Sequence, residues 1–216
     1  MKTKFVGFDW DSTLAKMPQN SWNMVEKELG CESEDRLSKA MFDRREIDYA
    51  TWCRLSFELY KRFNLNEAKM RRAMANLALH EGAIETINKL RSMGVKVGII
   101  SGGIYNMYEC ASKKFGLKVD YVSFGARFIF DKRGRLIGSR CNSYDYEGKL
   151  DIFKIFCKRA NTTVKKAFYI GDSDNDVYIF KASNGIAFVS DSEELKRHAK
   201  YIVDRHDLRE VLRFIP

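Results

Sequence analysis

The chain has 216 residues, a length suited to one well-cored domain or to a domain that carries a smaller insert. Hydrophobic residues make up 45% of it and proline occurs twice, a composition typical of a compact globular protein that excludes extended disorder. Apolar runs fall short of the roughly 20 residues that span a membrane, and the N-terminal segment has no signal-peptide core. We therefore expect a cytoplasmic protein with no membrane partner, either a monomer or a homodimer.

The formal net charge of +9 raises the question of an anionic partner. Basic residues alternate with acidic ones along helical stretches such as 193–200 and 207–214, as they do on solvated helix faces. We therefore expect a small anionic substrate and no nucleic acid. The cysteines are odd in number and scattered without a CxxC pair, so we expect reduced thiols rather than a disulfide framework or a zinc site; they are Cys31, Cys53, Cys110, Cys141 and Cys157.

Helix and strand patterns can be read in chain order. An apolar run at 4–8 predicts the first strand, and the periodic segments from 15 to 79 all predict helices, with no strand pattern. Helices and strands then alternate, with a hairpin at 127–138 that turns at 132–134. The expected helices are 81–94, 105–115, 148–160, 175–183, 192–199 and 208–215, and the expected strands are 95–100, 119–124, 166–171, 185–189 and 201–204.

This order predicts an α/β fold with a doubly wound, mostly parallel sheet and a Rossmann-type core. The helical block lies between the first strand and its crossover helix. We therefore expect a core domain of residues 1–14 and 80–216, with residues 15–79 inserted as a helical-bundle cap over the sheet edge.

Polar clusters follow three of the predicted strands, where ligands bind in such sheets. Asp9 and Asp11 follow the first strand in "DWDST", and an extended backbone sends both carboxylates to the same side, so their charges repel unless a cation lies between them. The second cluster is "SGG" at 101–103, and the third is "GDSDND" at 171–176. The sequence therefore predicts a metal and phosphate site at this edge.

Each cluster has a simpler interpretation. Asp11 or Ser12 is also a good N-cap for a following helix, and a lone "SGG" or a lone Lys149 is a weak signal. A calcium loop beginning at Asp172 is excluded, because it needs glycine where Val177 stands and glutamate where Ser183 stands. The order in which the clusters occur together is much more specific than any one of them.

In that order the chain resembles the haloacid dehalogenase-like phosphatases, and among them the phosphoserine phosphatase group. The resemblance covers essentially the full length: "DWDST", "SGG", Lys149 and "GDSDND" match the four motifs of the family, and residues 15–79 match its helical cap. It implies a Mg²⁺-dependent phosphomonoester hydrolase of the cytoplasm that acts on a small phosphorylated metabolite through an aspartyl-phosphate.

The resemblance also assigns roles to residues. Asp9 would be the nucleophile and Asp11 the general acid and base, and Mg²⁺ would be held by Asp9, Asp172 and the backbone carbonyl of Asp11. Asp176 would orient the nucleophile and the lysine, whereas Asp174 departs from the small residue expected there and receives no role. The phosphoryl oxygens would be held by Ser101, Gly102, Gly103, Lys149 and Asn175.

The cap departs from this group, in which a glutamate and an arginine hold the substrate's ammonium and carboxylate. Alignment places Asn20 at the glutamate position and Ser56 at the arginine position, and Arg54 faces away from position 56 on a helix. We therefore expect a substrate other than phosphoserine, in a less polar pocket; its candidate lining residues are Asn20, Tyr49 and Ser56, with Trp22 and Trp52.

Two other functions remain open from the sequence. A phosphomutase or phosphotransferase would use the same motifs with a cap that excludes water. A non-catalytic module that binds anions or nucleic acid would need none of the catalytic carboxylates. A true phosphoserine phosphatase is the alternative within the hydrolases.

Overall fold

The computed structural model describes residues 2–17, 20–142 and 146–216. Within these ranges seven strands form one sheet in the order β6-β5-β4-β1-β7-β8-β9, and every neighbouring pair is parallel except β5 and β6. The predicted fold is confirmed. The strands are β1 Phe5–Phe8, β4 Lys96–Ile104, β5 Tyr121–Phe130, β6 Leu136–Cys141, β7 Phe168–Gly171, β8 Asn184–Phe188 and β9 Tyr201–Val203.

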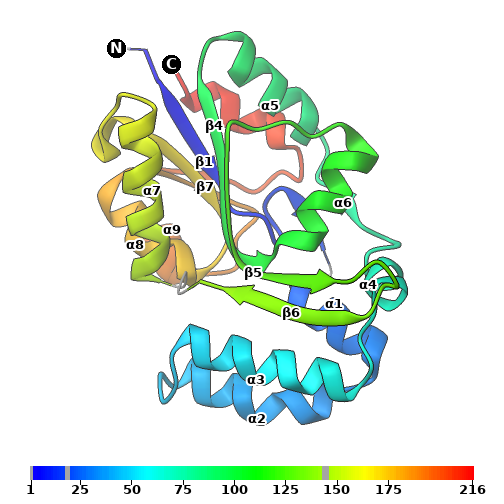
Figure 1. The fold of residues 1–216 in the computed structure, drawn as a ribbon. Helices are drawn as coiled ribbons and strands as arrows, with labels where there is room; N and C mark the ends of the chain where they lie inside the picture. The colour runs from blue at the N-terminus through cyan, green and yellow to red at the C-terminus, as the bar shows by residue number, and fades with distance from the viewer. Residues whose placement is uncertain (1, 18–19, 143–145) are drawn as a thin grey trace.

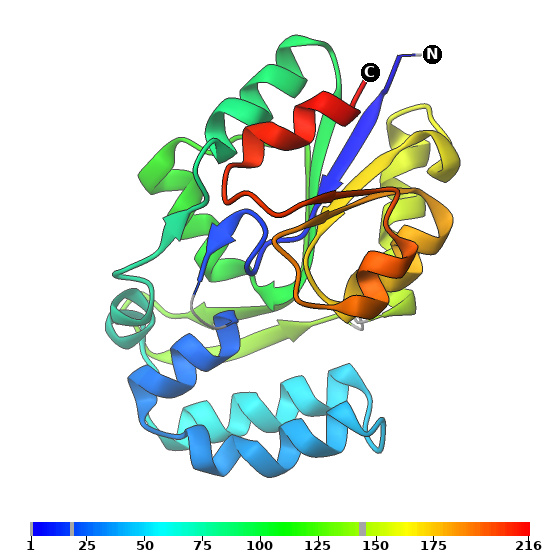
Figure 2. The same ribbon diagram turned by 180° about the vertical axis from the view of Figure 1, so that it is seen from behind.

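Helices cover both faces of the sheet (Figures 1 and 2). The central strand β1 is buried on both sides, because Val6 and Phe8 pack into one hydrophobic cluster and Phe5 into the other. A 3-10 helix, η3, stands where we expected a final α-helix. One face carries α5 Ala83–Ser92, α6 Tyr105–Phe115 and η3 Leu208–Phe214; the other carries α7 Glu147–Arg159, η1 Val164–Lys166, η2 Asp174–Asp176, α8 Val177–Ala182 and α9 Glu193–His198.

Four helices, here called the helical insert, follow the first strand and lie beyond the β5–β6 hairpin (Figure 1). Side-chain oxygens of Asn20, Asp48 and Asn66 accept backbone N–H groups at the starts of α1, α3 and α4, which fixes where these helices begin. The helices are α1 Ser21–Leu29, α2 Glu32–Asp43, α3 Tyr49–Arg62 and α4 Glu67–Ala73.

A small second sheet joins the helical insert to the rest of the chain. β2 Ala15–Lys16 pairs antiparallel with β3 Ala78–Leu79, where the chain leaves the main sheet and returns to it. The expectation of no strand between 15 and 79 was therefore wrong, because a strand of two residues is too short to show alternation. The domain boundaries at 14 and 79 remain a prediction. Among the described residues, no helix is long and apolar enough to cross a membrane.

The expectation that all cysteines are reduced thiols was also wrong. Cys53 in α3 and Cys141 at the end of β6 form a disulfide, with their Cα atoms 6.2 Å apart. The pair is 88 residues apart in sequence, so only the packing of the insert on the hairpin brings it together. Cys31, Cys110 and Cys157 are free. The disulfide therefore ties the helical insert to the main sheet.

Candidate active site

Three neighbouring parallel strands end at one point. β1 lies between β4 and β7, and Asp9, Ser101 and Asp172 stand at the carboxyl ends of these strands. Ser101 remains within β4, whose pairing with β5 is irregular between Ser101 and Ile104. Asp9 and Ser101 are buried. The three motifs that the sequence placed at strand ends thus meet in space.

Lys149, in the first turn of α7, connects two of these motifs through hydrogen bonds. Its fully buried ammonium donates hydrogen bonds to Asp9 Oδ2 at 2.8 Å, to Asp176 Oδ1 at 2.7 Å and to Asn175 Oδ1 at 3.0 Å. Burial alone would disfavour the charged form, but the carboxylates of Asp176 and Asp9 outweigh it and hold the pKa of Lys149 above its usual value. Lys149 is therefore a fixed positive charge beside Asp9 at neutral pH.

Asp9, Asp172 and Asp176 form an acidic cluster whose carboxylate oxygens lie within 4.8 Å of one another. Burial, together with the charges of Asp9 and Asp176, raises the pKa of Asp172 well above its usual value. Burial also raises the pKa of Asp176 to about 7, against the opposing charge of Lys149. One lysine faces three carboxylates, so the cluster has an excess of negative charge. A cation that prefers oxygen ligands therefore fits it.

Asp11 is held by the helical insert. Its Oδ2 accepts hydrogen bonds from the backbone N–H of Ser21 at 3.0 Å and from the Ser21 hydroxyl at 2.9 Å, and Ile104 N–H donates to the same hydroxyl oxygen at 3.1 Å. Burial raises the pKa of Asp11 to about 6 although the Ser21 hydrogen bonds oppose the shift. Among the described residues, Asp11 Oδ1 has no hydrogen-bond partner. One oxygen is thus anchored, while the other is buried without a partner in the described ranges.

The glycines of "SGG" allow the insert to approach the sheet closely. A Cβ on Gly103 would lie 2.6 Å from Ser21 Oγ and 3.0 Å from Asp11 Oδ2, so a side chain there would displace the anchored carboxylate. The Gly102 carbonyl accepts hydrogen bonds from Trp22 Nε1 at 3.1 Å and from the Tyr49 hydroxyl at 2.6 Å. Hydrogen bonds therefore join the loop at 101–103 to the helical insert.

A cavity of about 270 Å³ lies between these two parts. The sheet side contributes carboxylates, hydroxyls and glycine backbone, and the insert contributes an aromatic wall and one charged pair. The lining residues are Asp9, Asp11, Ser12, Ser101, Gly102, Gly103, Tyr146, Asp172, Ser173 and Asn175 from the sheet side, and Asn20, Trp22, Lys39, Phe42, Asp43, Tyr49 and Trp52 from the insert.

Comparison with known proteins agrees with this geometry. A family model for haloacid dehalogenase-like hydrolases matches residues 3–184. The chain belongs to this family. It is 30% identical to the phosphoserine phosphatase of Methanocaldococcus jannaschii, over 99% of this chain and 98% of that one, and 27% identical to that of Wolinella succinogenes, over 97% and 98%. A solved structure described as a phospho-aspartyl intermediate analogue of phosphoserine phosphatase has a TM-score of 0.80 at 27% identity and covers both chains fully.

In this haloacid dehalogenase-like hydrolase, most of the sequence-predicted site residues come together, and three need comment. Ser56 does not line the cavity; it is buried in α3 and donates to Asp35 Oδ1 at 3.4 Å. Arg54 is exposed, as expected for a residue facing away. Asp174 is exposed and accepts a hydrogen bond from the Ser192 hydroxyl, so a charged side chain is accommodated at this position.

Sequence reasoning missed the polar groups that the insert brings to the hydrolase site. Ser21 contacts Asp11, and Lys39, paired with Asp43, lines the cavity. The "EDRLSKAMFD" helix carried one usable signal: Lys39 and Phe42 are three residues apart and therefore share a helix face.

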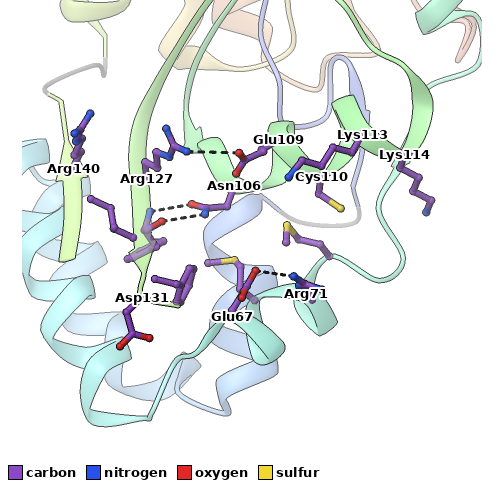
Figure 3. A pocket seen from close by; sticks show the side chains of 15 residues that line it. Glu67, Arg71, Asn106, Glu109, Cys110, Lys113, Lys114, Arg127, Asp131 and Arg140 are labelled. Atoms are coloured by element: carbon purple, nitrogen blue, oxygen red, sulfur yellow. Dashed lines mark hydrogen bonds and ion pairs between the residues drawn. The ribbon is translucent and has the colours of Figure 1, made fainter. Parts of the chain in front are cut away.

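A larger hollow of about 860 Å³ lies elsewhere, between α4, α6 and β5 (Figure 3). Two ion pairs lie on its rim: Arg71 pairs with Glu67 at 2.7 Å, and Arg127 approaches Glu109 at 3.6 Å. Within the described ranges it shares no lining residue with the cavity at Asp9. The hollow is therefore separate from the cavity at Asp9.

Proposed function

We propose that this enzyme hydrolyses a small phosphomonoester by way of an aspartyl-phosphate on Asp9. The observation that carries the proposal is the Lys149 ammonium, buried between Asp9, Asn175 and Asp176, beside a cavity that Asp9 and Asp11 line. A carboxylate attacks a phosphate dianion only where positive charge offsets the repulsion, and Lys149 supplies one such charge beside Asp9.

A magnesium ion fits the acidic cluster because the donors are all oxygens. Asp9, Asp172 and the backbone carbonyl of Asp11 would hold it, and Asp176 lies near enough to contribute. When bound, the ion would offset the charge of the phosphate and of the carboxylates around it.

The residues then have distinct tasks in the first half-reaction. An oxygen of Asp9 attacks phosphorus, the bond between phosphorus and the ester oxygen breaks, and Asp11 gives its proton to that oxygen. Ser21 keeps Asp11 turned toward the cavity during this step. In the second half-reaction, Asp11 takes a proton from water while the water oxygen attacks phosphorus, and the bond to Asp9 breaks to release inorganic phosphate.

The phosphoryl oxygens would be held by donors at the ends of β4 and η2. The Gly103 N–H donates to Ser101 Oγ at 3.1 Å, which turns the hydroxyl hydrogen of Ser101 away from that amide. Asn175 accepts from Lys149 through Oδ1, which leaves its amide hydrogens for the substrate. The Gly102 amide would be a further donor, and Lys149, whose three N–H groups already point to oxygens of the protein, would act through its charge.

The substrate we propose is a small phosphorylated metabolite other than phosphoserine. The named relatives are phosphoserine phosphatases, but the positions at which that group carries a charged pair hold Asn20 and Ser56 here. Asn20 Oδ1 already accepts the Asn23 N–H at 3.0 Å, and Ser56 lies outside the cavity.

Release of inorganic phosphate from p-nitrophenyl phosphate tests the proposed function. Turnover is expected with Mg²⁺, to stop with EDTA and to return when Mg²⁺ is restored. Formation of an isomeric phosphate ester without inorganic phosphate would indicate a phosphomutase instead. Absence of any turnover under all of these conditions would overturn the proposal.

A further inference from the structure

The insert side of the cavity is built mainly from aromatic rings that pack on one another. Trp22 and Trp52 have ring centroids 4.5 Å apart, and Phe42 stacks on Trp52 at 5.1 Å with an interplanar angle of 12°. Tyr49 packs against Trp52 at 5.6 Å. Such rings fix each other's orientation, so polar groups along this wall are held in defined positions.

One cationic side chain reaches the cavity from the described part of the insert. Lys39 in α2 places its ammonium 5.8 Å from the Phe42 ring and 6.0 Å from the Trp52 ring, and it pairs with Asp43 one helical turn away. Its side chain is 38% exposed, so it lies at the mouth of the cavity. An anionic group of a bound molecule can therefore take the place of Asp43 beside it.

A further donor belongs to Trp52, in the same wall. Trp52 is 3% exposed, and its indole N–H has no hydrogen-bond partner among the described residues. An indole N–H only donates, and a buried donor that stays unpaired carries a desolvation cost. A ligand that brings an oxygen acceptor to this wall recovers that cost.

We propose that the substrate is a short phosphorylated hydroxy acid whose carboxylate is read by Lys39 and the Trp52 N–H. This inference rests on the proposed function and adds the chemistry of the organic group. Asn20 Oδ1, at the position where the phosphoserine phosphatase group carries a glutamate, is not open to an ammonium group because it caps α1. The Lys39 charge over the Phe42 and Trp52 rings also repels a cation from those rings.

Four esters separate the two charges of a phosphoserine-like substrate. Carboxylate without ammonium is tested with 3-phosphoglycerate, both charges with L-phosphoserine, ammonium alone with phosphoethanolamine, and neither with glycerol 3-phosphate. We expect kcat/KM for 3-phosphoglycerate to exceed that for glycerol 3-phosphate about tenfold, the effect of one charge-assisted contact. L-phosphoserine is expected to gain nothing further from its ammonium.

Three variants assign the effect to its residues. Lys39→Gln should lower the ratio of kcat/KM for 3-phosphoglycerate to that for glycerol 3-phosphate about fivefold or more, mainly through KM, and Trp52→Phe should lower it less. Asp43→Asn should raise it, because it frees the Lys39 ammonium. Lys61→Gln, an exposed α3 lysine outside the cavity, is the matched control and should leave the ratio unchanged.

The outcomes distinguish this inference from the proposed function. Hydrolysis of p-nitrophenyl phosphate with equal kcat/KM on all four esters would overturn the carboxylate inference alone. A preference for L-phosphoserine and phosphoethanolamine would overturn it in favour of ammonium recognition. Failure to hydrolyse p-nitrophenyl phosphate as well would overturn both.

Discussion

Ser21, the first residue of α1, holds the Asp11 carboxylate through two hydrogen bonds, one from its backbone N–H and one from its hydroxyl. The same hydroxyl accepts the Ile104 N–H of β4, so one buried side chain links the insert, the proposed acid and base, and the main sheet. The position of Asp11 therefore depends on how the helical insert is seated.

We predict that Ser21→Ala lowers kcat about tenfold, since a hydrogen bond to a charged group contributes roughly 1.5–3 kcal/mol and its loss lets Asp11 rotate. Ser21→Thr keeps the hydroxyl and should restore most of the activity. Steady-state hydrolysis of p-nitrophenyl phosphate is the measurement. Ser33→Ala, at a serine of α2 that bonds only to its neighbour Glu34, is the control. Full kcat in Ser21→Ala would show that Asp11 needs no anchor.

Asp9→Asn should abolish turnover while the fold stays intact, because an amide is a poor nucleophile and a weak metal ligand. Asp174→Asn is a matched control, since this exposed aspartate contacts only Ser192 in the hydrogen bonds described. Circular dichroism checks the fold, and release of inorganic phosphate measures turnover. More than a few per cent of wild-type activity in Asp9→Asn would contradict its role as nucleophile.

The strand-end motifs could be predicted from the sequence because their geometry is local. Asp9, Ser101 and Asp172 each follow an apolar run, and parallel strands bring their carboxyl ends to one edge whatever the details of packing. Lys39 and Ser21 could not be found in this way. Both are ordinary polar helix residues, and only the packing of the insert on the sheet brings Lys39 to the cavity and Ser21 to Asp11.

Beryllium fluoride with Mg²⁺ should inhibit the enzyme by imitating the phosphoryl group on Asp9, and Lys149→Ala should weaken this inhibition more than Ser101→Ala does. The lysine supplies a full charge where water is excluded, whereas the serine supplies one neutral hydrogen bond. The inhibition constant is the measurement. Lys154→Ala, at an exposed lysine of the same helix paired with Asp151, is the control. Equal inhibition of Lys149→Ala and wild type would contradict a phosphate-binding role for Lys149.

The insert should lose stability as pH rises through the neutral range. Burial and the nearby Asp35 carboxylate raise the pKa of Glu26 to about 7. Between about pH 4.5 and pH 7 the folded state therefore keeps a proton that the unfolded state has lost, so the free energy of unfolding falls as pH increases. The buried Tyr60 hydroxyl, 3.1 Å from Glu26 Oε1, also resists ionisation, because burial raises its pKa well above the usual value.

Glu26→Gln removes this titration, so the loss of stability between pH 5 and pH 8 should shrink by about 2 kcal/mol relative to wild type. Urea unfolding at both pH values measures it. Glu58→Gln, at an exposed glutamate of α3, is the control and should behave as wild type does. An unchanged pH dependence in Glu26→Gln would mean that Glu26 is ionised in the folded state.

The Cys53–Cys141 disulfide closes a long loop, and no local sequence signal predicts such a pair, because both cysteines lie outside any recognisable spacing motif. A closed loop of this length stabilises a fold by roughly 4–5 kcal/mol in the chain-entropy view. Cys53→Ser should therefore lower Tm by about 10 °C or more, and dithiothreitol should lower the Tm of the wild type by a similar amount but leave that of the variant unchanged. Thermal unfolding with and without reductant is the measurement, and Cys110→Ser, at a free cysteine, is the control.

Because the bond ties α3 to β6, its loss should also let the insert move more freely, and hydrogen exchange in α3 should rise together with the fall in Tm. A wild-type Tm that ignores reductant, with two thiols titrating at Cys53 and Cys141, would show that the pair is not bonded in solution.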